Sequence, residues 1–374
     1  MSAQQVNSLT YSILNQLYAS QNATKNVALG GISLYMMLGA LNVGLSGTSY
    51  DQLSHYLGDD FEDLLDQETW RSSPTARTWI FLRTISLGLS IMKSQLVCSC
   101  YLYDHYKRVT NYVFNLHDIQ VDTSNPAESA DQINKWISDQ TFESIGNWFD
   151  ESMISPDKIV LVDTFGLNAE WLTKFNEALT TEELFYDDNG QSSEVAMMNQ
   201  IGFTFVYDSP DEDFKIMFKP FKEQNLYFVV MLPRDGYGVE DVLKTFKIEQ
   251  MYDYYDKSES KYVKLKLPKL KLIGKTDLVE TFKQFGITEI FNPDQADFKR
   301  MTNHTVFVEN LLQITNVVIG EQGVTTAETT KDTLDESLTD VDEFYMTKPF
   351  LLFVYSTSAR LVLFGAIVSN PNAT

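Results

Sequence analysis

Apolar residues recur at helical spacing in the first part of the chain. In residues 5–20 they lie three or four positions apart, and they are Val6, Leu9, Ile13, Leu14 and Leu17. This spacing predicts an amphipathic helix. Residues 33–42 are apolar on nearly every side, which predicts a buried helix, and residues 49–57 carry a shorter amphipathic pattern.

Further along the chain the pattern changes toward strands. Residues 78–92 alternate enough to predict one long strand, whereas residues 95–108 and 126–142 have helical patterns. Strand-like runs bounded by turn residues follow, at 158–167, 216–220, 226–232 and 262–272. One more helix is predicted at 276–285. Helices thus crowd the first half and strands the second, which favours an α+β fold over a doubly wound sheet.

Residues 320–343 interrupt this pattern. The segment holds six Thr, two Gly and eight acidic residues and no aromatic residue, and it separates two strand-like segments, 305–319 and 344–368. Structureless loops longer than about 12–15 residues are usually functional or disordered. Its composition could not anchor a core, so we expect it to be exposed. Residues 324–330 are rich in β-branched side chains, so this part could become a strand if a sheet opened for it.

Composition and charge narrow the class of protein. The chain has 374 residues, 44% of them hydrophobic, and no Pro-, Gly- or Ser-rich linker divides it, so we expect one domain over residues 1–374. No apolar run is long enough to span a bilayer. The formal charge of −22 disfavours nucleic acid, heparin-like polyanions and anionic membranes as partners and favours cationic ones.

The two cysteines, Cys98 and Cys100, lie two positions apart, a spacing that we expect to be poor for a disulfide between them. A chain of this length without a plausible disulfide fits a reducing compartment. Residues 1–10 lack the basic and apolar regions of a classical signal peptide. Together these features predict a cytoplasmic location, with secretion by a non-classical route as the alternative.

Sequence motifs of catalysis are absent. The chain contains no nucleophile elbow, P-loop, zinc-protease helix or dinucleotide-binding glycine pattern, and its four histidines lie at no metal-ligand spacing from one another. Acidic pairs such as Glu182-Glu183 are typical of a solvated surface. We therefore predict no enzymatic activity, no cofactor and no metal.

Six groups of residues, in the same order along the chain, resemble the serpin family. They are Asn26 and Ser33 with Gly44–Thr48; Val162–Trp171 with Phe175; Val195–Met198; Leu265–Lys269; Asp277-Leu278 with Phe285–Thr288; and Lys348–Phe350 with Phe353 and Phe364–Pro371. Each motif is weak alone, but six in order are specific. The resemblance implies helices packed around a large five-stranded central sheet, two further sheets and an exposed reactive-centre loop at residues 320–343.

The resemblance also implies a mechanism and site residues. A protease cleaves the loop, which then enters the central sheet as a new strand and traps the protease as an acyl-enzyme. The hinge of the loop falls on seven residues, Glu321, Gln322, Gly323, Val324, Thr325, Thr326 and Ala327. The sheet-opening region falls on Ser33, Asp163, Trp171 and Gln313, where Asp163 and Gln313 replace a family Asn and His. We expect an inhibitory, intracellular-type, monomeric member.

The position of the cleaved bond follows from counting residues from either end of the loop, and the two counts differ by one residue. Counting from Gly323 gives Ser337 as the specificity residue, and counting back from Lys348 gives Leu338, so the scissile region is Ser337, Leu338 and Thr339. A branched apolar side chain fills a chymotrypsin-like pocket better than serine does. The expected target is a cationic, chymotrypsin-like serine protease.

A non-inhibitory serpin remains the alternative. On insertion, side chains alternate between the two faces of the sheet, so Val324, Thr326, Glu328, Thr330 and Asp332 would share the inward face. Burying an unpaired carboxylate costs several kcal/mol. If Glu328 and Asp332 prevent insertion, the loop is only a substrate and the protein is a binding or carrier module.

Overall fold

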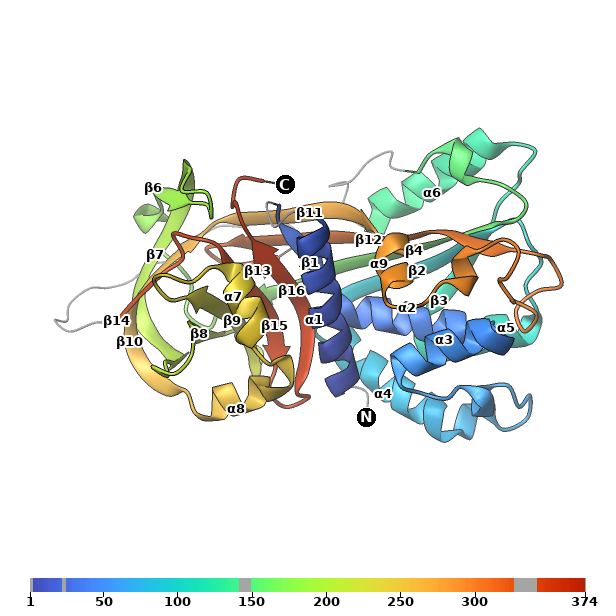
Figure 1. The fold of residues 1–374 in the computed structure, drawn as a ribbon, viewed down its shortest axis with the longest axis horizontal. Coiled ribbons are helices and arrows are strands. Elements are labelled where there is room, and N and C mark those ends of the chain that lie inside the picture. Colours follow the sequence, from blue (N-terminus) through green and yellow to red (C-terminus); the bar gives the residue numbers. More distant parts are fainter. Residues whose placement is uncertain (1–2, 22–24, 141–148, 326–341, 374) are drawn as a thin grey trace.

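The computed structural model describes residues 3–21, 25–140, 149–325 and 342–373. Helices and strands alternate in no simple order, and two large sheets form the body of the molecule (Figure 1). Within the described ranges, no helix is both long enough and apolar enough to cross a membrane.

The α-helices are α1 (Ala3–Ser20), α2 (Gly31–Val43), α3 (Gly47–Leu57), α4 (Pro74–Leu87), α5 (Asp104–Val109), α6 (Pro126–Gln140), α7 (Val239–Thr245), α8 (Met251–Asp256) and α9 (Val279–Gln284). The strands are β1 (Val27–Leu29), β2 (Ser90–Cys98), β3 (Leu116–Gln120), β4 (Lys158–Leu167), β5 (Ala169–Glu170), β6 (Thr181–Tyr186), β7 (Ser192–Tyr207), β8 (Phe214–Pro220), β9 (Leu226–Pro233), β10 (Glu259–Pro268), β11 (Leu270–Asp277), β12 (Phe307–Gly320), β13 (Gly323–Thr325), β14 (Asp342–Tyr345), β15 (Phe350–Ser356) and β16 (Leu361–Val368).

The predicted helices at 5–20, 33–42 and 49–57 are confirmed as α1, α2 and α3, and the strand at 158–167 is confirmed as β4. The helix predicted at 126–142 is confirmed as α6 up to Gln140, and the strands at 216–220 and 226–232 lie within β8 and β9. The helix predicted at 276–285 is shorter, because β11 continues to Asp277 before α9 begins.

The strand predicted at 78–92 and the helix predicted at 95–108 are wrong. Residues 74–87 form helix α4, strand β2 runs from Ser90 to Cys98, and only α5 is helical within 95–108. The hydroxyl of Ser73 caps α4 by accepting a hydrogen bond from the Ala76 amide at 3.1 Å, and Pro74 occupies the first turn. Trp79 is buried against Tyr35, their rings stacked at 4.6 Å. The N-cap and the packing of Trp79 against the core therefore stabilise a helix in this segment.

The predicted strand at 262–272 is in fact parts of two strands in different sheets. The chain crosses from β10 to β11 between Pro268 and Leu270. Proline removes a backbone donor, which suits a point where a strand leaves its sheet.

The central sheet has seven strand segments in the described residues. Their order is β3-β2-β4-β12-β13-β5, with β11 paired to the other edge of β12. Only Asn168 separates β4 from β5, so these two segments count as one strand. The sheet then consists of β3, β2, β4 with β5, β12 and β11, which agrees with the expected five strands. The short strand β13 is an addition between β5 and β12.

Among the described residues, the two further sheets implied by the resemblance are two halves of one nine-stranded sheet. One half contains β6, β7, β10 and β14, and the other contains β8, β9, β15, β16 and β1. They join through three residue pairs between β7 and β8, from Phe205–Phe218 to Tyr207–Ile216.

Both faces of the central sheet are covered. Helix α6 contributes Ile133 and Ile137 to a small apolar cluster with Val160 and Val162 of β4. The opposite face packs into the main core, to which α1–α4 and both sheets contribute. Figure 1 shows α6 on one side of β2, β4 and β12 and α2–α5 on the other. Successive side chains of β4 therefore point in turn to the two faces of the sheet, and both faces are covered by apolar residues.

The expectation about the cysteines is also wrong. Cys98 and Cys100 form a disulfide, with their Cα atoms 5.3 Å apart. Side chains two positions apart at the end of a strand lie on the same face, and this Cα separation is within the range that a disulfide allows. The compartment predicted from unpaired cysteines therefore loses that support.

Candidate functional site

The central sheet forks at one end. Strands β4 and β12 pair in parallel from Lys158–Phe307 to Gly166–Asn316. Beyond that point β12 no longer pairs with the strand formed by β4 and β5, because β13 lies between them. Val324 of β13 is opposite Ile319 of β12 on one side and Ala169 of β5 on the other. The sheet is thus closed along most of its length and already carries one more strand at the fork.

The beginning of the predicted loop is buried in this fork. Glu321 and Gln322 are less than 10% exposed, Val324 is 0% exposed, and Gly323 is also buried. The expectation that residues 320–343 are exposed is therefore wrong for residues 320–325, which form the last residue of β12, a turn and β13. Thr325 is half-buried.

Several predicted site residues lie outside the described residues. They are Thr326 and Ala327 of the hinge and Ser337, Leu338 and Thr339 of the scissile region.

Trp171 holds the turn at the fork. Its indole Nε1 donates to the Gly320 carbonyl at 2.8 Å, and its backbone amide donates to the Gln322 carbonyl at 3.0 Å. The amide of Phe175 donates to the Glu321 carbonyl at 3.0 Å. Backbone approach is close here, since a Cβ at Gly323 would lie 2.1 Å from the Ala169 carbonyl oxygen. Only glycine fits at position 323 without moving β5.

A buried lysine supports Trp171 from the other side. Lys219 of β8 is 4% exposed, and its Nζ lies 5.3 Å from the Trp171 ring centre and 4.7 Å from that of Phe175. The ammonium donates to Gln200 Oε1 at 2.6 Å and to the Thr173 carbonyl at 3.0 Å. Burial lowers the pKa of Lys219 to about 7. The aromatic cluster at the fork is therefore fixed by both sheets.

Glu321 connects the turn to two other elements. Its carboxylate lies 3.1 Å from Lys269 Nζ and accepts from the Thr180 hydroxyl at 2.9 Å. Burial alone would raise the pKa of Glu321, but hydrogen bonds from the backbone, Thr180 and Lys269 hold it below its usual value. Because the folded-state pKa is depressed, this stabilisation is present above the unfolded pKa and is lost as the pH falls.

Removing this charge should weaken the fork. We expect Glu321→Gln to lower the free energy of unfolding at pH 7.5 by about 1–2 kcal/mol, since it removes a charged partner of Lys269 but keeps the shape of the side chain. Urea unfolding followed by tryptophan fluorescence measures this. The exposed Glu182→Gln is the control and should change nothing. An equally small change in both variants would show that the ion pair contributes no stability.

A second cluster lies halfway along the sheet. The Asp163 carboxylate of β4 accepts three hydrogen bonds, from the Ser33 hydroxyl of α2 at 2.6 Å, the Ser94 hydroxyl of β2 at 2.8 Å and the Gln313 amide of β12 at 2.7 Å. Gln313 also exchanges hydrogen bonds with the backbone of Gly30 at 2.9 and 3.0 Å. The Asp163–Gln313 bond crosses the pairing between β4 and β12.

Asp163 is a buried carboxyl with neutral partners. It is 0% exposed, and Ser33, Ser94 and Gln313 carry no charge. Burial raises the pKa of Asp163 to about 6, although the three hydrogen bonds act in the opposite direction. The charge of this side chain near neutral pH is therefore costly.

The predicted sheet-opening residues thus fall in two places. Ser33, Asp163 and Gln313 are in contact, whereas Trp171 lies at the fork with Glu321, Gln322 and Gly323. Sequence reasoning missed Ser94, Thr180, Lys219 and the ion-pair role of Lys269. Ser94 lies between two segments that were assigned wrongly. Lys269 belongs to a motif quoted above, but its partner is distant in sequence.

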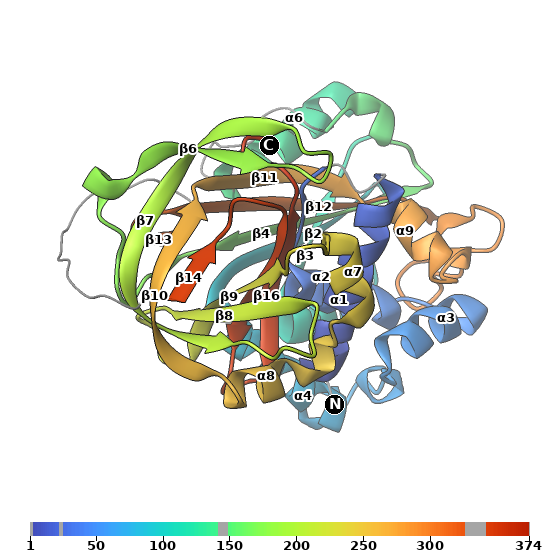
Figure 2. The ribbon, with the colours of Figure 1, turned by 60° about the vertical axis from the view of Figure 1, so that its left-hand side comes forward.

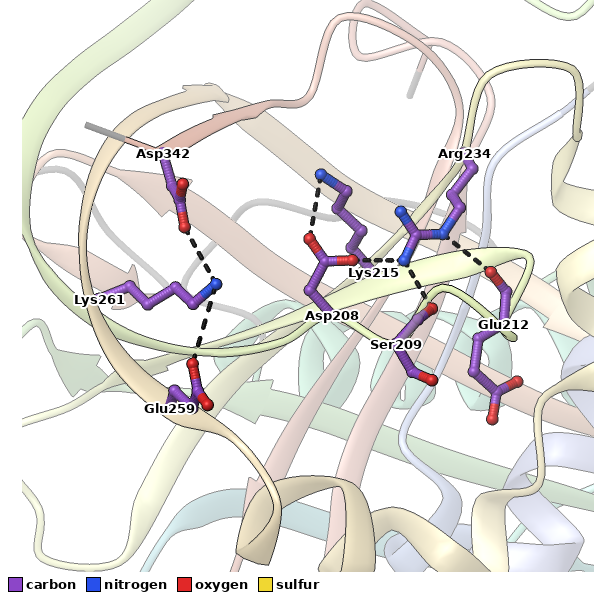
Figure 3. Close-up of polar contacts among 8 residues, drawn as sticks. All are labelled: Asp208, Ser209, Glu212, Lys215, Arg234, Glu259, Lys261 and Asp342. Atoms are coloured by element: carbon purple, nitrogen blue, oxygen red, sulfur yellow. Dashed lines mark hydrogen bonds and ion pairs between the residues drawn. The ribbon is translucent and has the colours of Figure 1, made fainter. Parts of the chain in front are cut away.

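The other end of the predicted loop joins the nine-stranded sheet. Strand β14 begins at Asp342 and pairs in parallel with β10, from Val263–Asp342 to Lys266–Tyr345. Lys261 Nζ lies 3.2 Å from the Asp342 carboxylate and 4.0 Å from that of Glu259 (Figure 3). Figure 3 also shows the neighbouring cluster in which Asp208 contacts Lys215 and Arg234. The segment between Thr325 and Asp342 is therefore attached to a different sheet at each end.

Comparison with known proteins gives one consistent result. The family model "Serpin (serine protease inhibitor)" matches residues 4–371. The chain is 31% identical to human Serpin B4 over 253 residues, which are 66% of this chain and 64% of Serpin B4, just under two thirds of that relative. It is 24% identical to mouse Serpin B11 over 371 residues, 94% of this chain and 95% of that protein. Native protease nexin-1, solved with heparin, superposes with a TM-score of 0.83 at 19% identity and covers 99% of both chains.

Proposed function

The chain belongs to the serpin family, and from this premise we propose that it inhibits serine proteases by trapping them as acyl-enzymes. The family model that matches the chain is described as a serine protease inhibitor and not as an enzyme. The observation that carries the proposal is β13, because this strand lies between β5 and β12 where an inserting loop would begin. No residue of this chain performs the covalent chemistry, since the nucleophile belongs to the protease.

The covalent step is peptide-bond hydrolysis that stops after its first half, the acylation of the protease serine. The serine oxygen of the protease attacks the carbonyl carbon of the specificity residue, the peptide C–N bond breaks, and the new amine leaves with a proton. An ester then joins the protease to the loop. Water would hydrolyse this ester unless the protease is first displaced and deformed, so trapping requires insertion to be faster than hydrolysis.

The length of the loop supports this proposal. Thr325 lies opposite Val318, and each further residue of the loop would lie opposite one residue earlier on β12. In that register residue 336 would reach Phe307, where β12 begins. Cleavage after Ser337 or Leu338 would therefore free a strand that extends along the whole of β12, replacing the pairs between β4 and β12 with two new rows of hydrogen bonds.

One observation favours the non-inhibitory alternative. The same register would place Glu328 opposite Thr315, which is 5% exposed. Because Val324 faces the core, Glu328 would face it too, and burying its carboxylate costs several kcal/mol unless it is protonated or paired. If insertion were slow at this point, water would hydrolyse the acyl-enzyme ester first and leave a nicked chain.

A denaturing gel after mixing the protein with a chymotrypsin-like protease tests the proposal. A band near the summed mass of the two chains supports trapping, and a nicked chain with full protease activity supports the alternative. A cationic protease is the preferred probe, because this chain has a formal net charge of −22 and oppositely charged proteins associate faster.

The specificity residue gives a further prediction. We expect Leu338→Ala to slow the second-order reaction with the protease by roughly tenfold, because a chymotrypsin-like pocket loses most of its apolar contact. Ser337→Ala should leave the rate unchanged, and it serves as the matched control. Mass spectrometry of the released peptide identifies the cleaved bond. A slower reaction for Ser337→Ala and not for Leu338→Ala would assign the bond to Ser337.

A further inference from the structure

An aromatic pair, with one ring exposed and the other half-buried, lies beside the attachment point of the loop. Phe203 of β7 is 71% exposed, and its ring centre lies 5.0 Å from that of Tyr262 on β10, with the planes at 62°. The two residues are opposite each other in the antiparallel pairing of β7 and β10. Their inward neighbours, Thr204 and Val263, are buried, so this pair belongs to the outer face of the sheet.

The outer face continues across β14. Lys264 of β10 is exposed and lies opposite both Ile201 of β7 and Glu343 of β14. Tyr345 follows one step along the same face, with Lys264 and Lys266 near its ring. We call the surface of Ile201, Phe203, Tyr262, Lys264, Glu343 and Tyr345 the outer patch. Aromatic residues at the surface are enriched where proteins bind partners.

The position of the outer patch, close to where the loop joins β14, indicates which partner would bind it. Residues 337 and 338 are at most five residues from Asp342, so the scissile bond lies within about 18 Å of the start of β14. A protease of about 230 residues has a radius of gyration of about 17 Å. A protease whose active site holds that bond is therefore large enough to reach the surface around β14. Its nearest part is the side of its cleft that binds residues after the bond, since those residues lead to Asp342.

We infer that the outer patch is a second binding site for the target protease, which contacts an apolar area on the leaving-group side of the active-site cleft. This inference deepens the proposed function and rests on it only for the identity of the partner. Phe203 and Tyr262 would supply most of the contact, because rigid aromatic side chains bury a large area at small entropic cost. The site would set how fast the protease attacks the loop, and it would have no effect on the later choice between trapping and hydrolysis.

A comparable aromatic residue elsewhere provides the control. Phe81 of α4 is 68% exposed, almost as much as Phe203. Helix α4 lies away from β7, β10 and β14 in both views (Figures 1 and 2). Phe81→Ala therefore removes the same side chain from a surface that a loop-bound protease does not reach.

The experiment measures the second-order rate at which chymotrypsin consumes the intact chain, counting trapped and nicked products together. We expect the double variant Phe203→Ala, Tyr262→Ala to be consumed about tenfold more slowly than the wild type, and Phe81→Ala to be consumed at the wild-type rate. The ratio of trapped to nicked chain should be the same in all three proteins. Equal rates in the double variant and the wild type would overturn the inference.

The same gel separates this inference from the proposed function. If the wild type yields only nicked chain, trapping fails as a function, but the rate comparison still tests the outer patch. A lower rate accompanied by a lower unfolding midpoint would call for Phe203→Leu, which keeps the apolar area. This variant should react nearly as fast as the wild type if contact area is the cause, and a rate as low as that of the double variant would overturn the inference.

Discussion

Replacing Val324 by arginine should convert the protein from an inhibitor into a substrate of its target protease. Val324 is 0% exposed between Ile319 and Ala169, at the position from which an inserting strand would grow. An arginine there must either bury its guanidinium without a partner or pull β13 out of the fork. Burying an unpaired charge costs several kcal/mol.

The effect is large because trapping is a competition between two rates. A barrier to insertion raised by about 3 kcal/mol slows insertion more than 100-fold, while hydrolysis of the acyl-enzyme continues unchanged. We therefore expect Val324→Arg to give nicked chain and active protease, with almost no covalent complex. The measurement is the amount of inhibitor needed to abolish protease activity, together with a denaturing gel.

Thr325→Arg is the matched control. It introduces the same side chain one residue later, on the opposite face of β13, where Thr325 is only half-buried. This variant should trap protease nearly as well as the wild type. If Val324→Arg traps normally, insertion does not pass through the register of β13. If both variants fail, the hinge is sensitive to charge on either face, and burial of position 324 is not the reason.

The pattern of residues predicted the long elements well because their signal is local. The uniform apolarity of residues 33–42 and the short apolar run of residues 158–167 each agree with a buried environment, and both predictions are confirmed. The prediction for residues 78–92 is wrong because their alternation indicates a strand, whereas Ser73 and Pro74 just before them form the cap and first turn of a helix. Both of these residues are visible in the sequence.

The fork could not be predicted from composition. Residues 320–325 look like the remainder of the polar segment, yet Trp171 and Lys269 hold them in the sheet. Trp171 is about 150 residues away from this segment and Lys269 about 50. Nothing local distinguishes Glu321 from the acidic residues that follow. Non-local contacts also explain why Ser94 was missed, since its role depends on a hydrogen bond to a strand 69 residues later.

Position 163 shows what the resemblance added and what it left open. It directed attention to Ser33, Asp163 and Gln313, which are far apart in sequence and in contact in the structure. It could not tell what an aspartate does in place of the family's asparagine. That question has a physical answer, because the side chain is fully buried and titratable.

We expect Asp163→Asn to raise the free energy of unfolding at pH 8 by roughly 3 kcal/mol. The pKa of the buried carboxyl is raised from 3.8 to about 6. Each pKa unit corresponds to about 1.4 kcal/mol, so the charged form destabilises the folded state by about that total. Asparagine keeps the shape and removes the charge. Its amide can donate to Ser94, whose hydroxyl can reverse its role.

The sign of the pH dependence follows from the raised pKa. The folded state binds the proton of Asp163 more tightly than the unfolded state, so the contribution to stability is fully present below about pH 4 and is lost as the pH rises to about 6. The difference between Asp163→Asn and the wild type should therefore be near zero at pH 3.5, grow between pH 4 and 6, and stay constant above. Urea unfolding at several pH values measures it, with the exposed Asp294→Asn as control.

The same substitution bears on the opening of the sheet. The Asp163–Gln313 bond crosses from β4 to β12, so a strand inserted between them must break it. Separation of the strands would let water reach the carboxylate, and an ionised Asp163 would thereby favour opening. The asparagine variant should accordingly insert its cleaved loop more slowly at pH 8 and at the wild-type rate at pH 4. A difference in stability that is the same at both pH values would show that hydrogen-bond geometry, and not the charge of Asp163, controls this part of the sheet.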